Sequence, residues 1–162
     1  MRSFTEAAWQ ELGANLALCL ADLDEDDYLI IESKRAPYYV QFAAQGAYGM
    51  RAEAVGNGYI DEPDAVSTQE DYARARALGW CAATDLPEGD QTADRDPDGS
   101  PNFFIDVEQP VDYGRLAEVA VRTLREVYHV RHPGLLQYRA FAFDGPEIRF
   151  PVLRIKRGRE RG

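Results

Sequence analysis

The stretch from Pro37 to Ile60 constrains the fold more than any other part of the chain. Its sequence is PYYVQFAAQGAYGMRAEAVGNGYI, two apolar and aromatic runs on either side of Gln45-Gly46. In both runs apolar residues fall at every second position, which is the period of a strand with one buried face. These positions are Tyr38, Val40, Phe42 and Ala44, and then Tyr48, Met50, Ala52 and Ala54. The pattern predicts an antiparallel hairpin in the middle of a sheet, with helices packed on its apolar face.

The opposite face of the predicted hairpin has a different composition. It carries Tyr39, Gln41, Arg51 and Glu53. Polar groups next to an aromatic ring suit contact with a partner better than chemistry, because tyrosine is favoured where one end is buried and the other wet. The hairpin therefore indicates a small binding module, but it does not identify the ligand.

Helices and further strands are expected around the hairpin. The predicted elements are a helix with a capping box at Ser3 and Glu6, a strand over 27–32, a short helix with a capping box at Ser67 and Glu70 that ends at Gly79, a strand over 102–108, and a long helix from 110–112 to His132. Leu135–Phe143 and Glu147–Lys156 are each predicted as one more strand or an ordered arm. The predicted fold class is α+β, with 1–162 as one domain and a mobile basic tail from about 157.

Charge excludes some classes of partner. The formal net charge is -10, with 28 acidic against 18 basic residues. Binding to nucleic acid or to an anionic membrane needs a basic surface, so neither is expected as the main partner. A basic or apolar peptide remains compatible with this charge.

The compartment is predicted from what the chain lacks. We find no apolar run long enough to cross a bilayer, and the first residues, MRSFTEAAWQEL, do not resemble a signal peptide. Cys19 and Cys81 are too few for a disulfide framework, so we expect both to be buried, reduced thiols. These observations predict a cytoplasmic protein.

One acidic segment resembles the start of a calcium loop. Carboxylates stand at alternate positions, Asp94, Asp96 and Asp98, and Gly99 occupies the sixth position. The twelfth position, which should hold a bidentate glutamate, is Ile105. A solvated turn is the preferred interpretation, and these three aspartates stay as the weak metal candidates.

The two histidines are the next candidates for chemistry. The spacing of His129 and His132 places both near the end of the last long helix, with no cysteine or carboxylate cluster beside them in the sequence. A structural role at the helix end is preferred. We also find no nucleophile elbow, phosphate-binding loop or His-Glu-x-x-His motif. We therefore predict no enzyme and no cofactor, with a small-ligand domain or enzyme using His129, His132 or the 94–98 loop as the alternative.

Aromatic residues remain to be explained. The chain has nine tyrosines, seven phenylalanines and two tryptophans, more than a small core strictly needs. Aromatic residues are enriched at protein interfaces. The residues predicted to contact a peptide or a second subunit are Tyr28, Tyr39, Gln41, Tyr48, Arg51, Glu53 and Phe104.

The order of these elements and several short segments resemble a known family. The segments are Tyr39-Val40-Gln41-Phe42, Arg51 to Asn57, Leu78-Gly79-Trp80, Val121 to Tyr128, and His132-Pro133-Gly134 with the two leucines that follow. Together they are similar to the YbjN-like and class I type III secretion chaperone fold, and more closely to its actinobacterial branch, TY-Chap. The likeness covers most of residues 4–143.

The resemblance implies a function as well as a fold. It implies a small acidic homodimer that binds peptide segments of another protein. In secretion chaperones the partner wraps in extended form around apolar patches and adds a strand to a sheet edge, which is a recurring mode of peptide recognition. A non-catalytic peptide-binding module is therefore the main prediction.

Overall fold

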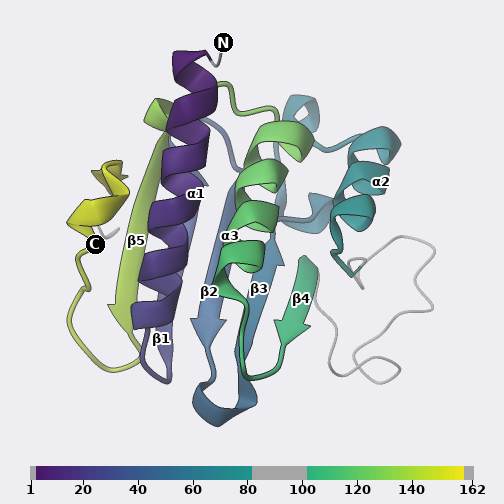
Figure 1. Ribbon diagram of the computed structural model, residues 1–162. Coiled ribbons are helices and arrows are strands. Elements are labelled where there is room, and N and C mark those ends of the chain that lie inside the picture. Colours follow the sequence, from purple (N-terminus) through teal and green to yellow (C-terminus); the bar gives the residue numbers. More distant parts are fainter. Residues whose placement is uncertain (1–2, 82–101, 159–162) are drawn as a thin grey trace, which may run out of the picture.

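The computed structural model describes residues 3–81 and 102–158. Within these ranges, helices cover one face of a six-stranded sheet with the strand order β4-β3-β2-β1-β5-β6 (Figure 1). The strands are β1 (Asp27–Ser33), β2 (Tyr39–Ala44), β3 (Met50–Ala54), β4 (Phe103–Val107), β5 (Leu136–Ala142) and β6 (Lys156–Arg157). The helices are α1 (Phe4–Asp22), α2 (Gln69–Leu78) and α3 (Tyr113–Arg122), which continues as a π-helical turn over Thr123–Val127. The predicted α+β class is confirmed.

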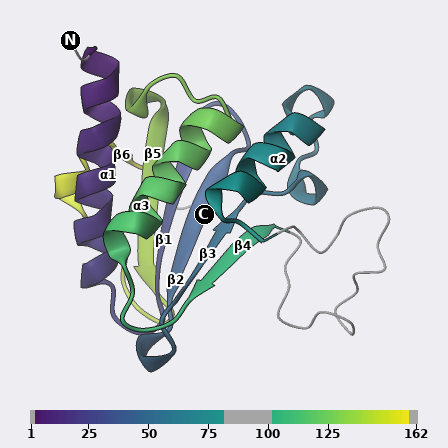
Figure 2. The same cartoon turned by 45° about the vertical axis from the view of Figure 1, so that its right-hand side comes forward.

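The helical layer consists mainly of α1 and α3. They lie next to each other across the sheet, while α2 stands beside them, towards the β3 and β4 side (Figure 2). The Ser3 half of the predicted capping box of α1 is present, because the Ser3 hydroxyl accepts from the Glu6 amide at 3.0 Å. The Glu6 carboxylate pairs with Arg125. The predicted end of α2 is also confirmed, since Gly79 adopts φ 115° there.

The cap of α2 lies one residue later than predicted. Thr68, not Ser67, accepts from the backbone of the third residue, and that residue is Asp71 rather than Glu70. Each of the two hydrogen bonds of this capping box measures 3.1 Å. Ser67 is held elsewhere, because its amide donates to the Asn57 side chain at 2.7 Å and its carbonyl accepts from the same side chain at 2.9 Å. These two hydrogen bonds, which we call the Asn57–Ser67 clasp, fix Ser67 before the helix, so that Thr68 takes the capping position.

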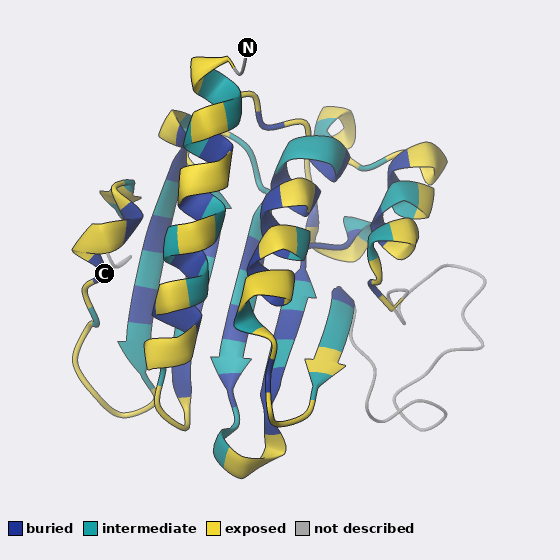
Figure 3. Cartoon of the chain, in the orientation of Figure 1, coloured by how far each residue is buried: buried dark blue, intermediate teal, exposed yellow. Residues whose placement is uncertain are grey.

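The central hairpin has the predicted pairing and buried face. β2 and β3 are antiparallel, with Phe42 opposite Ala52. Phe42 is 1% exposed and Ala52 is fully buried. Burial alternates along the strands, which Figure 3 shows as stripes of two colours. One predicted position is wrong: Tyr48 belongs to a 3-10 turn between the strands and is exposed.

A glycine explains why this turn interrupts the alternation. Gly49 adopts φ 100°, and a Cβ at this position would lie 1.8 Å from the carbonyl oxygen of Val107. Only glycine allows the turn to approach the end of β4 so closely. The turn therefore takes up the residues that the periodicity assigned to the start of the second strand.

The C-terminal part adds one full strand. β5 confirms the strand alternative for 135–143 and pairs antiparallel with β1. For 147–156 the ordered arm is the alternative found, since only Lys156–Arg157 pairs in a ladder, parallel to β5. Proline explains part of the difference: Pro151 opens a 3-10 turn over Pro151–Leu153 and has no amide to donate.

The two cysteines have different environments, which corrects one expectation. Cys19 is buried in α1, and burial raises its thiol pKa to about 12. Cys81 is exposed, although we predicted it to be buried. It follows Trp80, which is buried as expected and donates its indole N–H to the Thr123 hydroxyl at 2.8 Å. The tryptophan takes the place in the core, and the next residue therefore points outward.

Candidate functional site

The face of the sheet that points away from α1 and α3 is the candidate site. We call it the open face, because no helix in the described ranges packs on it and its side chains are partly exposed. An antiparallel sheet commonly has one face in the core and one towards solvent. The open face therefore follows from the alternation along β1 to β5.

Strand register arranges the open face in three rows. Residues of neighbouring strands that are paired in the ladders stand side by side on the same face. The first row is Phe141, Tyr28, Ala43, Arg51 and Asp106. The second row is Arg139, Ile30, Gln41, Glu53 and Phe104. The third row is Gln137, Glu32 and Tyr39.

Aromatic rings lie at the β5 end of the first row and at the β4 end of the second row. Tyr28 and Phe141 stack with ring centroids 5.4 Å apart. At the other end the Arg51 guanidinium lies over the Phe104 ring, 4.7 Å from its centroid, and also pairs with Asp106 at 2.9 Å. Such stacked groups hold rigid apolar surface at the rim of the face.

Charged side chains between the rings have oppositely charged or hydrogen-bonding partners on the same face. Arg139 pairs with Glu32 at 2.7 Å, and the Gln41 side chain donates to Glu53 at 3.3 Å. The Tyr39 hydroxyl accepts from the Asn102 amide group at 3.1 Å, and burial raises the pKa of this tyrosine. The open face is thus a surface of paired charges and aromatic rings rather than a single-sign patch.

A small depression lies in the centre of the open face. It has a volume of about 150 Å³. Its lining residues are Tyr28, Ile30, Gln41, Phe42, Ala43, Arg51, Glu53 and Phe141. Pockets for small molecules usually measure about 300–1,000 Å³, so this depression suits one side chain of a partner better than a cofactor.

The structure brings together six of the seven predicted contact residues. Tyr28, Tyr39, Gln41, Arg51, Glu53 and Phe104 all stand on the open face. Tyr48 does not, because it lies in the turn beyond the strands, beside Glu25 and Asp26. Their role in binding remains a prediction.

Sequence reasoning missed part of the same surface. Ile30, Glu32, Arg139 and Phe141 lie on the open face but were not predicted as contact residues. A signal was present in β5, where Gln137, Arg139 and Phe141 alternate with the buried Leu136, Tyr138 and Ala140. What the sequence lacks is the pairing of β5 with β1, which places this alternation beside the hairpin.

The histidines do not converge on one site. His129 Nε2 lies 2.8 Å from an oxygen of Asp71, whereas His132 accepts from the Gly134 amide through Nδ1 at 2.8 Å. Burial alone would raise the pKa of Asp71, but hydrogen bonds from Thr68 and His129 outweigh it and lower that pKa. His129 thus connects the end of α3 to the start of α2, in keeping with a structural role.

The metal candidates Asp94, Asp96 and Asp98 lie outside the described residues. Within 3–81 and 102–158, no group of three or more histidine, cysteine, aspartate or glutamate residues has the arrangement of a metal site. Across these same ranges, no helix is long and apolar enough to cross a membrane.

Comparison with known protein families decides the class of this chain. Residues 2–142 match the family TY-Chap3, described as T3SS (YopN, CesT) and YbjN peptide-binding chaperone 3. The chain belongs to this family. Neither the curated proteins nor the solved structures contain a match. As a member of TY-Chap3 the chain is a peptide-binding chaperone rather than an enzyme, and the predicted resemblance is confirmed.

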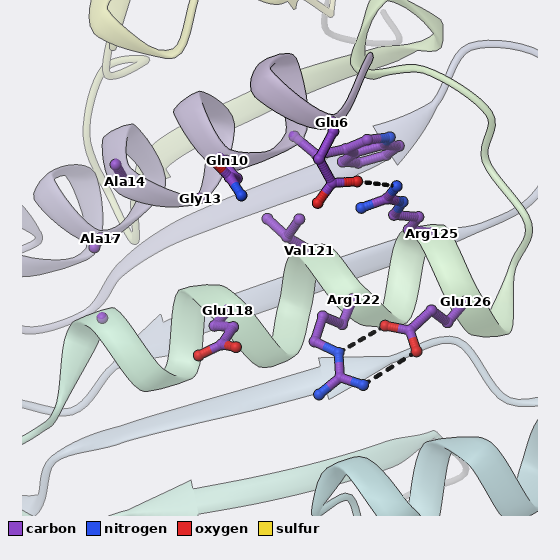
Figure 4. A pocket seen from close by; sticks show the side chains of 12 residues that line it. Glu6, Gln10, Gly13, Ala14, Ala17, Glu118, Val121, Arg122, Arg125 and Glu126 are labelled. Carbon is purple, nitrogen blue, oxygen red and sulfur yellow. Dashed lines mark hydrogen bonds and ion pairs between the residues drawn. The ribbon is translucent and has the colours of Figure 1, made fainter. Parts of the chain in front are cut away.

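A second surface feature lies on the helical side of the molecule, opposite the open face, and all its lining residues fall within the TY-Chap3 match. A groove of about 420 Å³ runs between α1 and α3 (Figure 4). Small residues Gly13, Ala14 and Ala17 form its α1 side. Along its rim Glu6 pairs with Arg125, and Arg122 pairs with Glu126 at 2.6 Å.

Trp9 also lines this groove and has one unusual property. The ring is 1% exposed, and its indole N–H is the buried side-chain group that finds no hydrogen-bond partner among the described residues. Burying an unpaired donor costs about 1–3 kcal/mol. In contrast to Trp80, whose N–H is paired, Trp9 contributes an unpaired donor to the wall of the groove.

Proposed function

We propose that this chaperone binds an extended segment of a client protein on its open face. The observation that carries the proposal is the clustering of Tyr28, Tyr39, Gln41, Arg51, Glu53 and Phe104 on one uncovered sheet face. Family membership supports a peptide as the ligand, and the three rows support a particular surface.

The physical chemistry of the open face suits a peptide. Tyrosine and phenylalanine rings offer apolar area at a small cost in side-chain entropy, and they dominate binding energy at many interfaces. Matched charges such as Arg139 with Glu32 leave little net field on the face. The overall charge of -10 keeps other surfaces repulsive towards acidic proteins.

Site-specific photo-crosslinking tests the proposal. A benzophenone amino acid is placed at Phe141 or Tyr28, both on the open face, and the protein is irradiated in lysate. We expect a common client to be captured from both positions. The matched control is the same probe at Leu18, which is 61% exposed on α1, away from the open face. Equal capture from Leu18 would contradict the assignment of the surface.

We also propose a cytoplasmic homodimer, in line with the resemblance. Light scattering after size exclusion measures the mass of the particle directly. Arg51→Glu with Tyr39→Ala then separates two roles of the open face. If the face binds clients, client capture falls and the mass of the particle is unchanged. If it joins subunits, the dimer dissociates.

A further inference from the structure

We propose that the outer edge of β5 is a second peptide-binding site, which the chain's own C-terminal segment occupies. We call residues 143–158 the C-terminal arm. The arm returns along β5 after a turn (Figure 1) and ends as β6 at the edge of the sheet (Figure 2). It lies beyond residue 142, where the family match ends.

Backbone hydrogen bonds seat the arm on the strand edge. The Ile148 amide donates to the Ala140 carbonyl, and the Gly158 amide donates to the Tyr138 carbonyl, each at 2.8 Å. Between them, the Phe150 amide donates to the Tyr138 hydroxyl at 2.8 Å. An unpaired strand edge is a template for pairing with another chain. The arm fills that template from within the molecule.

Two apolar side chains anchor the middle of the arm. Phe150 is 8% exposed and Leu153 is 2% exposed. The 3-10 turn that contains Leu153 packs against α1, and Arg154 pairs with Glu11 of α1 at 3.1 Å. The surface that holds the arm is therefore apolar next to the strand edge and has an acidic side chain, Glu11, at its margin.

The contacts of the arm are those of a ligand rather than of a sheet strand. Lys156 and Arg157 join the ladder in parallel, and the rest of the arm adds only an isolated antiparallel bridge between Glu147 and Phe141. The ion pair of Arg154 with Glu11 is largely exposed, and such pairs contribute little stability. We infer that the arm opens without unfolding of the rest of the chain. The segment that replaces it has two apolar residues three positions apart, followed by a basic residue.

A reversible crosslink tests this inference in the full-length chain. Gln137 and Lys156 are paired in the β5–β6 ladder, so the substitutions Gln137→Cys and Lys156→Cys allow a disulfide to close the arm. Cys81→Ser removes the exposed natural thiol. The probe is a fluorescent synthetic peptide of residues 146–158, and its anisotropy reports binding.

We expect the reduced protein to bind the probe at least tenfold more tightly than the oxidised protein. Leu153→Ala in the otherwise natural chain weakens the resident arm, so binding of the unchanged probe should tighten at least tenfold relative to the natural protein. A probe peptide with Leu153→Asp is the matched control and should not bind. Equal binding in both redox states, or absence of binding to the Leu153→Ala protein, would overturn the inference.

Hydrogen exchange provides a readout that needs no ligand. The Ile148 and Gly158 amides both donate to β5, so their exchange requires the arm to open. We expect protection factors at least tenfold lower than those of the amides in β1. Equal protection would show that the arm belongs to the cooperative core, and the inference would fail. The crosslink substitutes Gln137 at the β5 end of the open face, whereas hydrogen exchange uses the natural chain, so the exchange result is independent of the proposal for the open face.

Discussion

The two faces of the sheet differ in which side-chain substitutions they can tolerate. On the face under α1 and α3, Leu29, Ile31 and Val40 are fully buried. On the open face their strand neighbours Ile30, Glu32 and Gln41 are partly exposed. Glu32 pairs there with Arg139, and the Gln41 side chain donates a hydrogen bond to Glu53. The same backbone therefore supports a packed core and an adaptable surface, separated by a single residue along the chain.

This difference teaches where function can be placed without loss of stability. Core substitutions leave cavities that the surroundings fill only partly, whereas partly exposed side chains exchange one set of contacts for solvent. A chaperone that must present a variable surface gains from keeping that surface on the far side of its core strands.

The largest expected effect comes from the buried face. Phe42→Ala should lower the free energy of unfolding by about 3–5 kcal/mol, because it leaves a cavity under the helices. Its neighbour Gln41, on the open face, is the matched control, and Gln41→Ala should cost less than about 1 kcal/mol. Urea denaturation measures both. Similar losses for the two variants would break the distinction between the faces.

A smaller effect tests whether the helical side depends on polar contacts as well. Asp71→Asn should cost about 1 kcal/mol near neutral pH, because the carboxylate accepts from the Thr68 amide at the start of α2 and contacts Arg74 and His129. The pKa of Asp71 is lowered in the folded protein from its ordinary value of 3.8. The stabilisation is therefore present above that value and is lost as pH falls through the lower folded pKa.

Urea denaturation at several pH values measures this loss. The difference in stability between Asp71→Asn and the natural protein should shrink steadily below about pH 4. Glu70, in the same turn of α2 but largely exposed, is the control, and Glu70→Gln should show a much smaller difference at every pH. A difference for Asp71→Asn that does not change with pH would exclude its charge as the cause.

The smallest expected effect on stability belongs to the open face itself. Arg51→Ala removes the ion pair with Asp106 and the contact with the Phe104 ring, which should cost about 1 kcal/mol or less. Capture of a client by a crosslinker at Phe141 should nevertheless fall clearly. Thermal denaturation and crosslinking yield, measured on the same preparation, separate the two effects. A variant that unfolds readily but still captures its client would reverse the roles assigned to this arginine.

Sequence alone predicted those features that are encoded locally. The burial of Val40, Phe42 and Ala52 follows from alternation at every second position, and the end of α2 follows from Gly79. Tyr48 was placed wrongly because periodicity carries no information about the approach of Gly49 to β4. The α2 cap was one residue off because the clasp between Asn57 and Ser67 joins residues ten positions apart.

The candidate site was predictable in part for the same reason. Tyr39, Gln41, Arg51 and Glu53 lie in one hairpin, where pairing follows from the chain itself. Phe141 joins them only because β5 pairs with β1, and the two strands are far apart in sequence. The course of the C-terminal arm depends on that same pairing, so the alternatives for 147–156 stayed open until the structure was known.

The three rows of the open face are evenly spaced along the strands. Along a strand, neighbouring rows are two residues apart, which corresponds to about 6.6–6.8 Å. An extended peptide has the same repeat, so a client lying along β2 and β3 would present every second side chain to successive rows. The side chains between them would face solvent and would be free to vary. A surface of this kind selects clients by the spacing of a few residues, and many different sequences can meet that requirement.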